Sequence, residues 1–122
     1  MSHIFLQPDV RKDASWPLTI ESVSDAVRSN WPGTRLYVEG DGEDRRVGFF
    51  VRSIGSSVDC TFWEREPCLA VDMGEAGAAL CEWFLRLLPE DVPCIVYTEQ
   101  ETSPVSVITR ATAQEVLRAA RW

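Results

Sequence analysis

Apolar and polar side chains alternate with a period of two in three runs of the first half of the chain: Thr34–Glu39, Val47–Ser53 and Val58–Trp63. The segments between them are short and rich in glycine, aspartate and serine, which are turn residues. This pattern predicts three β-strands joined as an antiparallel meander. Cys68–Asp72 is expected either to add a fourth strand or to cross the sheet, and residues 3–6 are expected to form a short edge strand.

Two segments repeat their apolar residues every three or four positions, which predicts amphipathic helices. The first covers residues 20–31 and ends at Pro32-Gly33. The second carries a broad apolar stripe over Ala76–Leu88 and ends at Pro89. Proline cannot continue a helix because it lacks the backbone donor and crowds the preceding turn.

The last third of the chain predicts two strands and a final helix. The strands are expected at Pro93–Thr98 and Val105–Thr109, and Thr112–Glu115 has the spacing of a capping box that opens a helix. The predicted fold class is therefore α+β, as a single domain over residues 1–122. An antiparallel sheet of five to six strands is packed by three helices, in the order β-α-β-β-β-α-β-β-α.

The charge of the chain narrows the classes of partner. Nineteen acidic residues against twelve basic ones give a net charge of -7 over 122 residues. Such a balance argues against nucleic acid, because phosphate backbones are bound by neutralising cations. It suits a basic protein partner, although acidity also serves solubility alone. The longest apolar run is interrupted by Glu82 and Arg86, and the N-terminus lacks signal-peptide features, so a cytoplasmic protein without membrane contact is expected.

Residues that carry catalysis or hold metals are sparse in this sequence. His3 is the only histidine, and the four cysteines have no C-x-x-C pair, the spacing typical of zinc sites. Cys60, Cys81 and Cys94 lie in apolar patterns and are expected to be buried free thiols. The sequence predicts no catalytic, cofactor-binding or metal-binding residue. An enzyme or small-ligand domain remains as an alternative, which would require a deep pocket with converging polar groups.

Two short segments are candidates for binding a partner. A hairpin tip presents a run of carboxylates, which lacks the spacing of a calcium loop. Further along, an aromatic residue is followed by two glutamates that would form a charged rim. The candidate partner-binding residues are Asp41, Glu43 and Asp44 at the tip, then Trp63, Glu64 and Glu66, with Glu99 and Glu101 as a third choice.

Three aromatic residues fall on the polar faces of their predicted strands: Tyr37, Phe50 and Trp63. Two arrangements are compatible with this pattern. In the first, the three rings are buried, because helices cover both sides of the sheet or because Cys68–Asp72 folds over the rings. Otherwise they form an exposed aromatic patch of the kind that anchors protein interfaces.

The C-terminal half resembles small bacterial immunity proteins of polymorphic toxin systems. The resemblance rests on an aromatic-rich helix that ends in proline, a strand that ends in Tyr-x-Glu, a short strand and a capped helix. The segments are Trp83–Pro89, Cys94–Gln100, Val105–Thr109 and Thr112–Val116. The arginine stands at Arg86 here, where the family has it directly after the aromatics. The resemblance implies a protein that binds and neutralises a cognate toxin, here expected to be a basic toxin domain.

A second resemblance concerns the order of elements alone. Without the first strand, the predicted order α-β-β-β-α-β-β-α is similar to that of class I type III secretion chaperones, which are small, acidic and typically dimeric. This resemblance implies a chaperone that binds an effector. Because one fold serves many functions, element order supports it only weakly.

Overall fold

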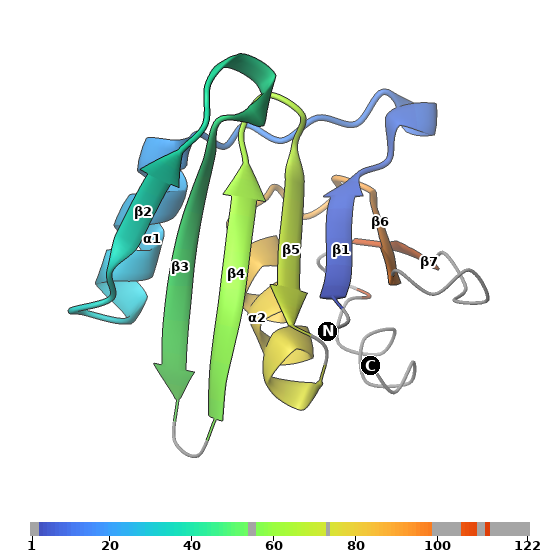
Figure 1. The fold of residues 1–122 in the computed structure, drawn as a ribbon. Helices are drawn as coiled ribbons and strands as arrows, with labels where there is room; N and C mark the ends of the chain where they lie inside the picture. Colours follow the sequence, from blue (N-terminus) through green and yellow to red (C-terminus); the bar gives the residue numbers. More distant parts are fainter. Residues whose placement is uncertain (1–2, 54–55, 73, 99–105, 110–111, 113–122) are drawn as a thin grey trace.

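The structure is a computed structural model that describes residues 3–53, 56–72, 74–98, 106–109 and 112. Its strands form one antiparallel sheet with the order β2-β3-β4-β5-β1-β6-β7 (Figure 1). The strands are β1 (His3–Pro8), β2 (Leu36–Glu39), β3 (Arg46–Ser53), β4 (Ser56–Trp63), β5 (Cys68–Asp72), β6 (Cys94–Thr98) and β7 (Ser106–Ile108). The α+β class and the antiparallel sheet are confirmed, with seven strands in place of the five to six predicted.

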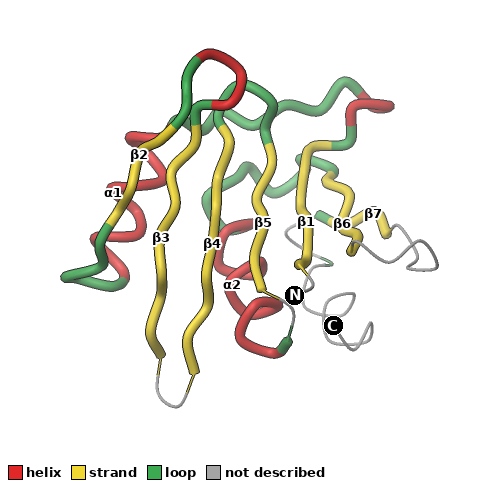
Figure 2. Tube along the Cα trace, in the orientation of Figure 1, coloured by secondary structure: helices red, strands yellow, loops and turns green. Residues whose placement is uncertain are grey.

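Two α-helices lie on the same face of this sheet, behind it in Figures 1 and 2. They are α1 (Ile20–Asn30) and α2 (Glu75–Leu85), and the described residues also include 3₁₀ turns at Val10–Lys12 and Gly42–Asp44. The third predicted helix, which begins after Thr112, falls outside the described residues. The described part of the chain therefore has two layers, a sheet and a pair of helices.

Alternation along the strands sends every second side chain into the core between the layers. The buried side chains of the sheet are mostly β-branched or aromatic, and the helices add a complementary apolar stripe. The largest fully buried side chains are Phe62, Phe84, Ile4, Leu6, Leu69, Leu85, Ile108, Val23, Val27, Val47 and Val71. The other face of each strand points away from the helices, which leaves one face of the sheet open within the described residues.

The position of β1 corrects the sequence prediction. An edge strand was expected at residues 3–6, but β1 lies inside the sheet and pairs with β5 on one side and β6 on the other. Ile4 and Leu6 are fully buried under the helix layer. A strand with two partners satisfies its backbone groups on both sides, so this short segment is held more firmly than its place in the sequence suggests.

The predicted antiparallel meander is confirmed, and it contains a fourth strand in addition to the three that were predicted. Each strand from β2 to β5 pairs antiparallel with the next. Cys68–Asp72 is therefore a strand of the sheet and does not fold over it. Four strands separate the two helices, whereas the chaperone-like order requires three, so the second resemblance does not match the observed order of elements.

The second helix ends three residues before the predicted boundary. After Leu85 the backbone N–H groups of Arg86, Leu87 and Leu88 each donate to a carbonyl three residues earlier, at 3.0–3.2 Å. These tighter bonds satisfy carbonyls that an α-helix leaves without partners at its end. The apolar stripe continues through this turn, which explains why periodicity alone extended the helix to Leu88.

A tryptophan fixes the connection between β1 and α1 to the core. Trp16 is buried, its ring centroid lies 5.1 Å from that of Phe84, and its Nε1–H donates to Cys94 Sγ at 3.3 Å. Earlier in the same connection, the buried carboxylate of Asp9 accepts from the backbone N–H and Nε of Arg11. The Arg11 side chain lowers the pKa of Asp9. Asp9 is therefore charged when folded, as a buried carboxylate with hydrogen-bonded partners can be.

Candidate functional site

Aromatic side chains gather on the open face of the sheet because they occupy the alternate positions of their strands. The two α-helices cover the opposite face, so within the described residues the open-face arrangement is the observed one. Tyr37 and Phe50 are exposed, at 54% and 45%. Trp63 is only partly exposed. The aromatic residues on this face are Phe5, Tyr37, Phe50, Trp63 and Tyr97.

A shallow groove crosses this face from β4 to β6. Its volume is about 580 Å³, and its lining includes Phe5, Trp63, Cys68 and Tyr97. Phe5 and Tyr97 stack with centroids 5.3 Å apart, and the Tyr97 hydroxyl donates to Gln7 Oε1 at 3.2 Å. These contacts hold the Phe5 and Tyr97 rings in place, so the groove offers a partly preformed surface that is mostly apolar, although Gln7, Arg65 and Glu66 also line it.

The carboxylates of the hairpin tip lie in the loop between β2 and β3. Gly40 opens this loop with φ +81°, and any side chain there would collide with the carbonyl of Asp44. The compact turn directs acidic side chains into solvent, where Asp41, Glu43 and Asp44 are all exposed. The loop is therefore shaped by its glycines and charged by the residues between them.

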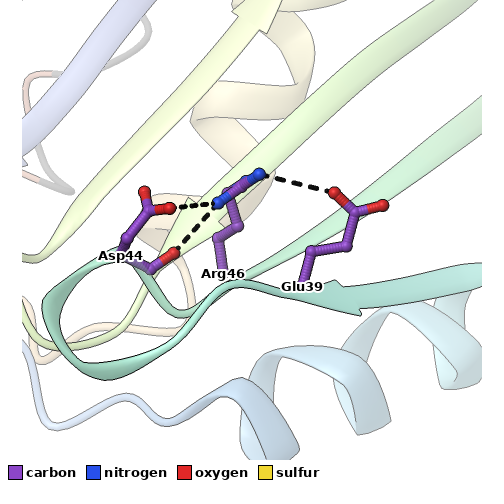
Figure 3. Close-up of polar contacts among 3 residues, drawn as sticks. All are labelled: Glu39, Asp44 and Arg46. Atoms are coloured by element: carbon purple, nitrogen blue, oxygen red, sulfur yellow. Dashed lines mark hydrogen bonds and ion pairs between the residues drawn. The ribbon is translucent and has the colours of Figure 1, made fainter.

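One arginine neutralises part of this charge (Figure 3). Arg46 Nη1 donates to Asp44 Oδ2 at 2.7 Å and to the Asp44 carbonyl at 3.1 Å, while Nη2 lies 3.4 Å from Glu39 Oε2. Within the described part of the chain, Asp41 and Glu43 form no ion pair. The uncompensated charge of the loop is thus carried by Asp41 and Glu43, and Asp44 mainly orders the loop.

The two candidate segments meet at one end of the sheet. Arg46, directly after the acidic loop, is the register partner of Trp63, and Trp63 is the partner of Cys68 in the next strand. Figure 1 shows the β2–β3 loop and the β4–β5 turn side by side at the top of the sheet. Glu66 lines the groove from that turn. The structure therefore brings Asp41, Glu43, Trp63 and Glu66 to one end of the open face.

Glu64 makes a contact within the chain that the sequence did not indicate, and its role in binding a partner stays a prediction. Its Oε1 accepts a hydrogen bond from the backbone N–H of Ile20, the first residue of α1, at 3.0 Å. A carboxylate at a helix N-terminus satisfies a free donor and stabilises the helix dipole. Glu64 therefore joins the sheet to the helix layer. Glu99 and Glu101, the third choice, lie outside the described residues.

Sequence reasoning missed Phe5 and Tyr97, which line the groove. Both lie on strands that were predicted, and both alternate with buried neighbours, so the signal was present. The edge position expected for β1 separated it from the meander, whereas pairing with β5 and β6 carries Phe5 to Tyr97 and near the β4–β5 turn. Long-range strand order, not local pattern, assembles this groove.

The four cysteines are free, and burial raises the pKa of each thiol. It raises the pKa of Cys81 to about 12 and those of Cys68 and Cys94 to about 11, and it raises the pKa of Cys60 further. Because the thiolate is the nucleophile and the metal ligand, these groups are poorly suited to either role near neutral pH. Cys60, Cys81 and Cys94 are buried as predicted.

The thiols are expected to resist alkylation in the folded protein at pH 8. They should react much faster when the protein is unfolded in urea at the same pH. Cys68 should react first as the pH rises, because it is half-exposed in the groove while the other three are buried. Iodoacetamide labelling followed by peptide mass spectrometry measures this order. A native thiol that reacts at pH 7 as fast as in urea would contradict it and restore a cysteine nucleophile to consideration.

Histidine and acidic side chains are the other groups that could carry catalysis or hold a metal ion. Within them, no group of three or more histidine, cysteine, aspartate or glutamate side chains is placed to hold a metal ion. His3 Nε2 lies 3.9 Å from Asp72 Oδ1 at the end of β1. In the described part of the chain, no helix has the length and apolar character needed to cross a membrane.

A second hollow lies at the opposite end of the open face, beside the loop that follows α1. Its volume is about 760 Å³, and its lining includes Trp31, Arg35, Tyr37, Phe50 and Arg52. Neither arginine forms an ion pair with another described residue. This cationic hollow contrasts with the acidic loop at the other end of the same hairpin.

Comparisons with protein-family models, curated proteins and solved structures give no match for this chain.

Proposed function

We propose that this chain is a non-enzymatic protein-binding domain, and that it acts as an immunity protein which neutralises a basic toxin domain. The observation that supports this most is the meeting of an aromatic groove and an acidic loop at one end of a sheet face that no described helix covers. The net charge of -7 and the C-terminal resemblance point in the same direction.

The groove would supply the affinity of such a complex. Phe5 and Tyr97 present ring surface that is already ordered by their stacking, so their contribution costs little side-chain entropy, and Trp63 adds a third ring to the groove. Aromatic residues near the centre of an interface commonly dominate its binding energy. Glu66 and the nearby loop would form the polar rim around them.

The acidic loop would raise the rate of association and favour basic proteins as partners. Asp41 and Glu43 lack neutralising partners among the described residues and project from a rigid hairpin. Unpaired surface carboxylates attract a basic protein over roughly one Debye length, about 8–10 Å at physiological salt. Such charges affect the association rate more than the final affinity.

Neutralisation by this chain would require no chemistry of its own. A toxin that cleaves or modifies nucleic acid needs a basic cleft, and an acidic surface that docks there blocks access to the substrate. The suppressed thiols are consistent with this division of labour. The reaction would belong to the toxin, and the role of this protein would be occlusion.

Charge reversal in the loop is expected to slow association with the partner. The double variant Asp41→Lys/Glu43→Lys should lower the association rate about tenfold at low salt and flatten its salt dependence. Stopped-flow or surface-plasmon kinetics with the purified product of a neighbouring toxin-like gene measures both effects.

The matched control is Asp25→Lys/Glu75→Lys, which makes the same charge change at exposed positions on the helix layer. It should retain most of the association rate. Equal slowing by both variants would show that net charge alone matters and would exclude the loop as the contact. If no neighbouring gene product binds the wild-type protein, the immunity proposal fails.

A further inference from the structure

Among the described residues, no strand lies beside the outer edge of β2. β2 pairs with β3 on one side and ends the sheet on the other. Edge strands expose unpaired backbone donors and acceptors, and proteins usually protect them with proline, bulges or covering segments. β2 contains no proline, and its register with β3 runs without a bulge from Leu36 to Glu39.

This edge also carries the exposed apolar surface of the described chain. Tyr37, Val38 and Phe50 are its exposed large hydrophobic residues, and all three belong to β2 or its neighbour β3. Val38 is 52% exposed although it points toward the helix face, so α1 does not cover the edge. Apolar side chains on both faces of this edge would be partly covered if another strand paired alongside β2.

Charges at the two ends of β2 are complementary. Arg35 precedes the strand and forms no ion pair among the described residues, while Glu39 ends it. The period of two puts Arg35, Tyr37 and Glu39 on the open face. The hairpin is thus cationic at the end with Arg35 and Arg52 and acidic at the end with the loop.

We propose that two copies of this chain associate through antiparallel pairing of their β2 edges, with Tyr37 opposite Tyr37 and Arg35 of each copy opposite Glu39 of the other. The two sheets then form one continuous sheet about a two-fold axis perpendicular to it. The occupant of the edge is a second copy of the chain because one five-residue segment carries both halves of each ion pair.

The two-fold axis limits the possible registers. It keeps the open faces of both copies on the same side of the joint sheet. A residue on the open face can therefore oppose only another open-face residue, so the centre of the pairing falls on a residue and not between two residues. A centre at Leu36 leaves Glu39 without a strand partner, and a centre at Val38 places Leu36 against Gly40, where the strand has ended at a positive φ. The centre at Tyr37 pairs the whole segment and forms both ion pairs.

Opposed residues of antiparallel strands bring their Cβ atoms within about 5.5 Å, close enough for Arg35 and Glu39 to bond directly. Glu39 can accept from this arginine and from Arg46 together, because a carboxylate has several acceptor positions. Three strands separate β2 from β1, so the groove of each copy remains open.

The test is a charge exchange. Wild-type protein is expected to have twice the mass of one chain in light scattering after size exclusion. Arg35→Glu places glutamate opposite glutamate, and Glu39→Arg places arginine opposite arginine, so each variant alone should self-associate at least about tenfold more weakly. An equal mixture of the two restores both ion pairs and should recover the dimer.

Arg86→Glu, an exposed position at the end of α2, makes the same charge change and should leave the dimer intact. The recovery of the dimer from the mixture also shows that both variants are folded. A monomeric wild type, a single variant that stays fully dimeric, or a mixture that stays monomeric would each overturn the proposal. This inference does not rest on the proposed function, because a dimer is compatible with an immunity protein and is also expected of a secretion chaperone.

Discussion

Replacing Gly77 by alanine is expected to destabilise the protein strongly, although glycine-to-alanine changes inside helices ordinarily stabilise by about 1 kcal/mol. Gly77 is buried in the first turns of α2. A Cβ at this position would overlap the backbone carbonyl of Asp72 at the end of β5 and would lie 3.4 Å from Val71 Cγ2. The obstacle is backbone of the adjoining strand, which cannot rotate away as a side chain can.

The helix would therefore have to move off β5, and several core contacts would be lost with it. A loss on the order of 2–4 kcal/mol in the free energy of unfolding is expected, as for overpacked cores. Urea denaturation followed by circular dichroism measures this. Ala79→Gly, an exposed position on the same helix, is the control and should cost only about 1 kcal/mol. A Gly77→Ala variant as stable as wild type would show that the layers are spaced more widely than described.

Truncating Phe84 to alanine should produce the largest loss of any single core residue, about 3–5 kcal/mol. Its side chain is fully buried in α2 and joins three parts of the chain. Its ring centroid lies 5.1 Å from that of Trp16 and 5.9 Å from that of Phe62. Removing the ring leaves a cavity among large, rigid neighbours that cannot readily collapse into it.

Phe50→Ala is the matched control because it removes the same side chain from an exposed position of β3. Its cost should be below about 1 kcal/mol at concentrations where the chain is monomeric. Thermal unfolding of both variants gives the comparison. Similar losses at the two positions would contradict the assignment of the helix-covered face as the core.

Local pattern was sufficient for much of the fold because it records which face of an element is buried. Val47, Phe49 and Val51 alternate with Gly48, Phe50 and Arg52, and the structure buries the first three and leaves Phe50 exposed. The stripe of α2 is equally clear, since Leu80, Phe84 and Leu85 are buried. In each case apolar residues recur at the spacing that places them on the buried face of the element, which is every second residue in a strand and every third or fourth in a helix.

Strand order could not be predicted in this way. The alternation of Ile4 and Leu6 indicates a strand with one buried face, but it does not say how many neighbours the strand has. The central place of β1 depends on pairing with β5 and β6, which are more than 60 and 80 residues away in the chain. Hydrogen bonds between backbones carry no residue preference strong enough to reveal such partners.

The sequence predicted single segments of the candidate site but not the contacts among their side chains. Turn chemistry identified the acidic loop, and alternation placed Trp63 on the polar face of β4. The capping of Ile20 by Glu64 joins segments that lie far apart in the chain, and the bond from Arg46 to Asp44, only two residues away, depends on the orientation of both side chains in the folded turn. These contacts decide which carboxylates remain free for a partner, and no spacing rule in the sequence expresses them.

The most direct test of the proposed function is a quantitative pull-down from the native host with two baits, the wild-type protein and Trp63→Ala. Trp63 lines the groove and is only partly buried, so the variant should remain folded. We expect one stoichiometric basic protein, encoded beside this gene, that is recovered with wild type and lost or strongly reduced with Trp63→Ala. No such protein with wild type, or equal recovery with both baits, would contradict binding through the open face.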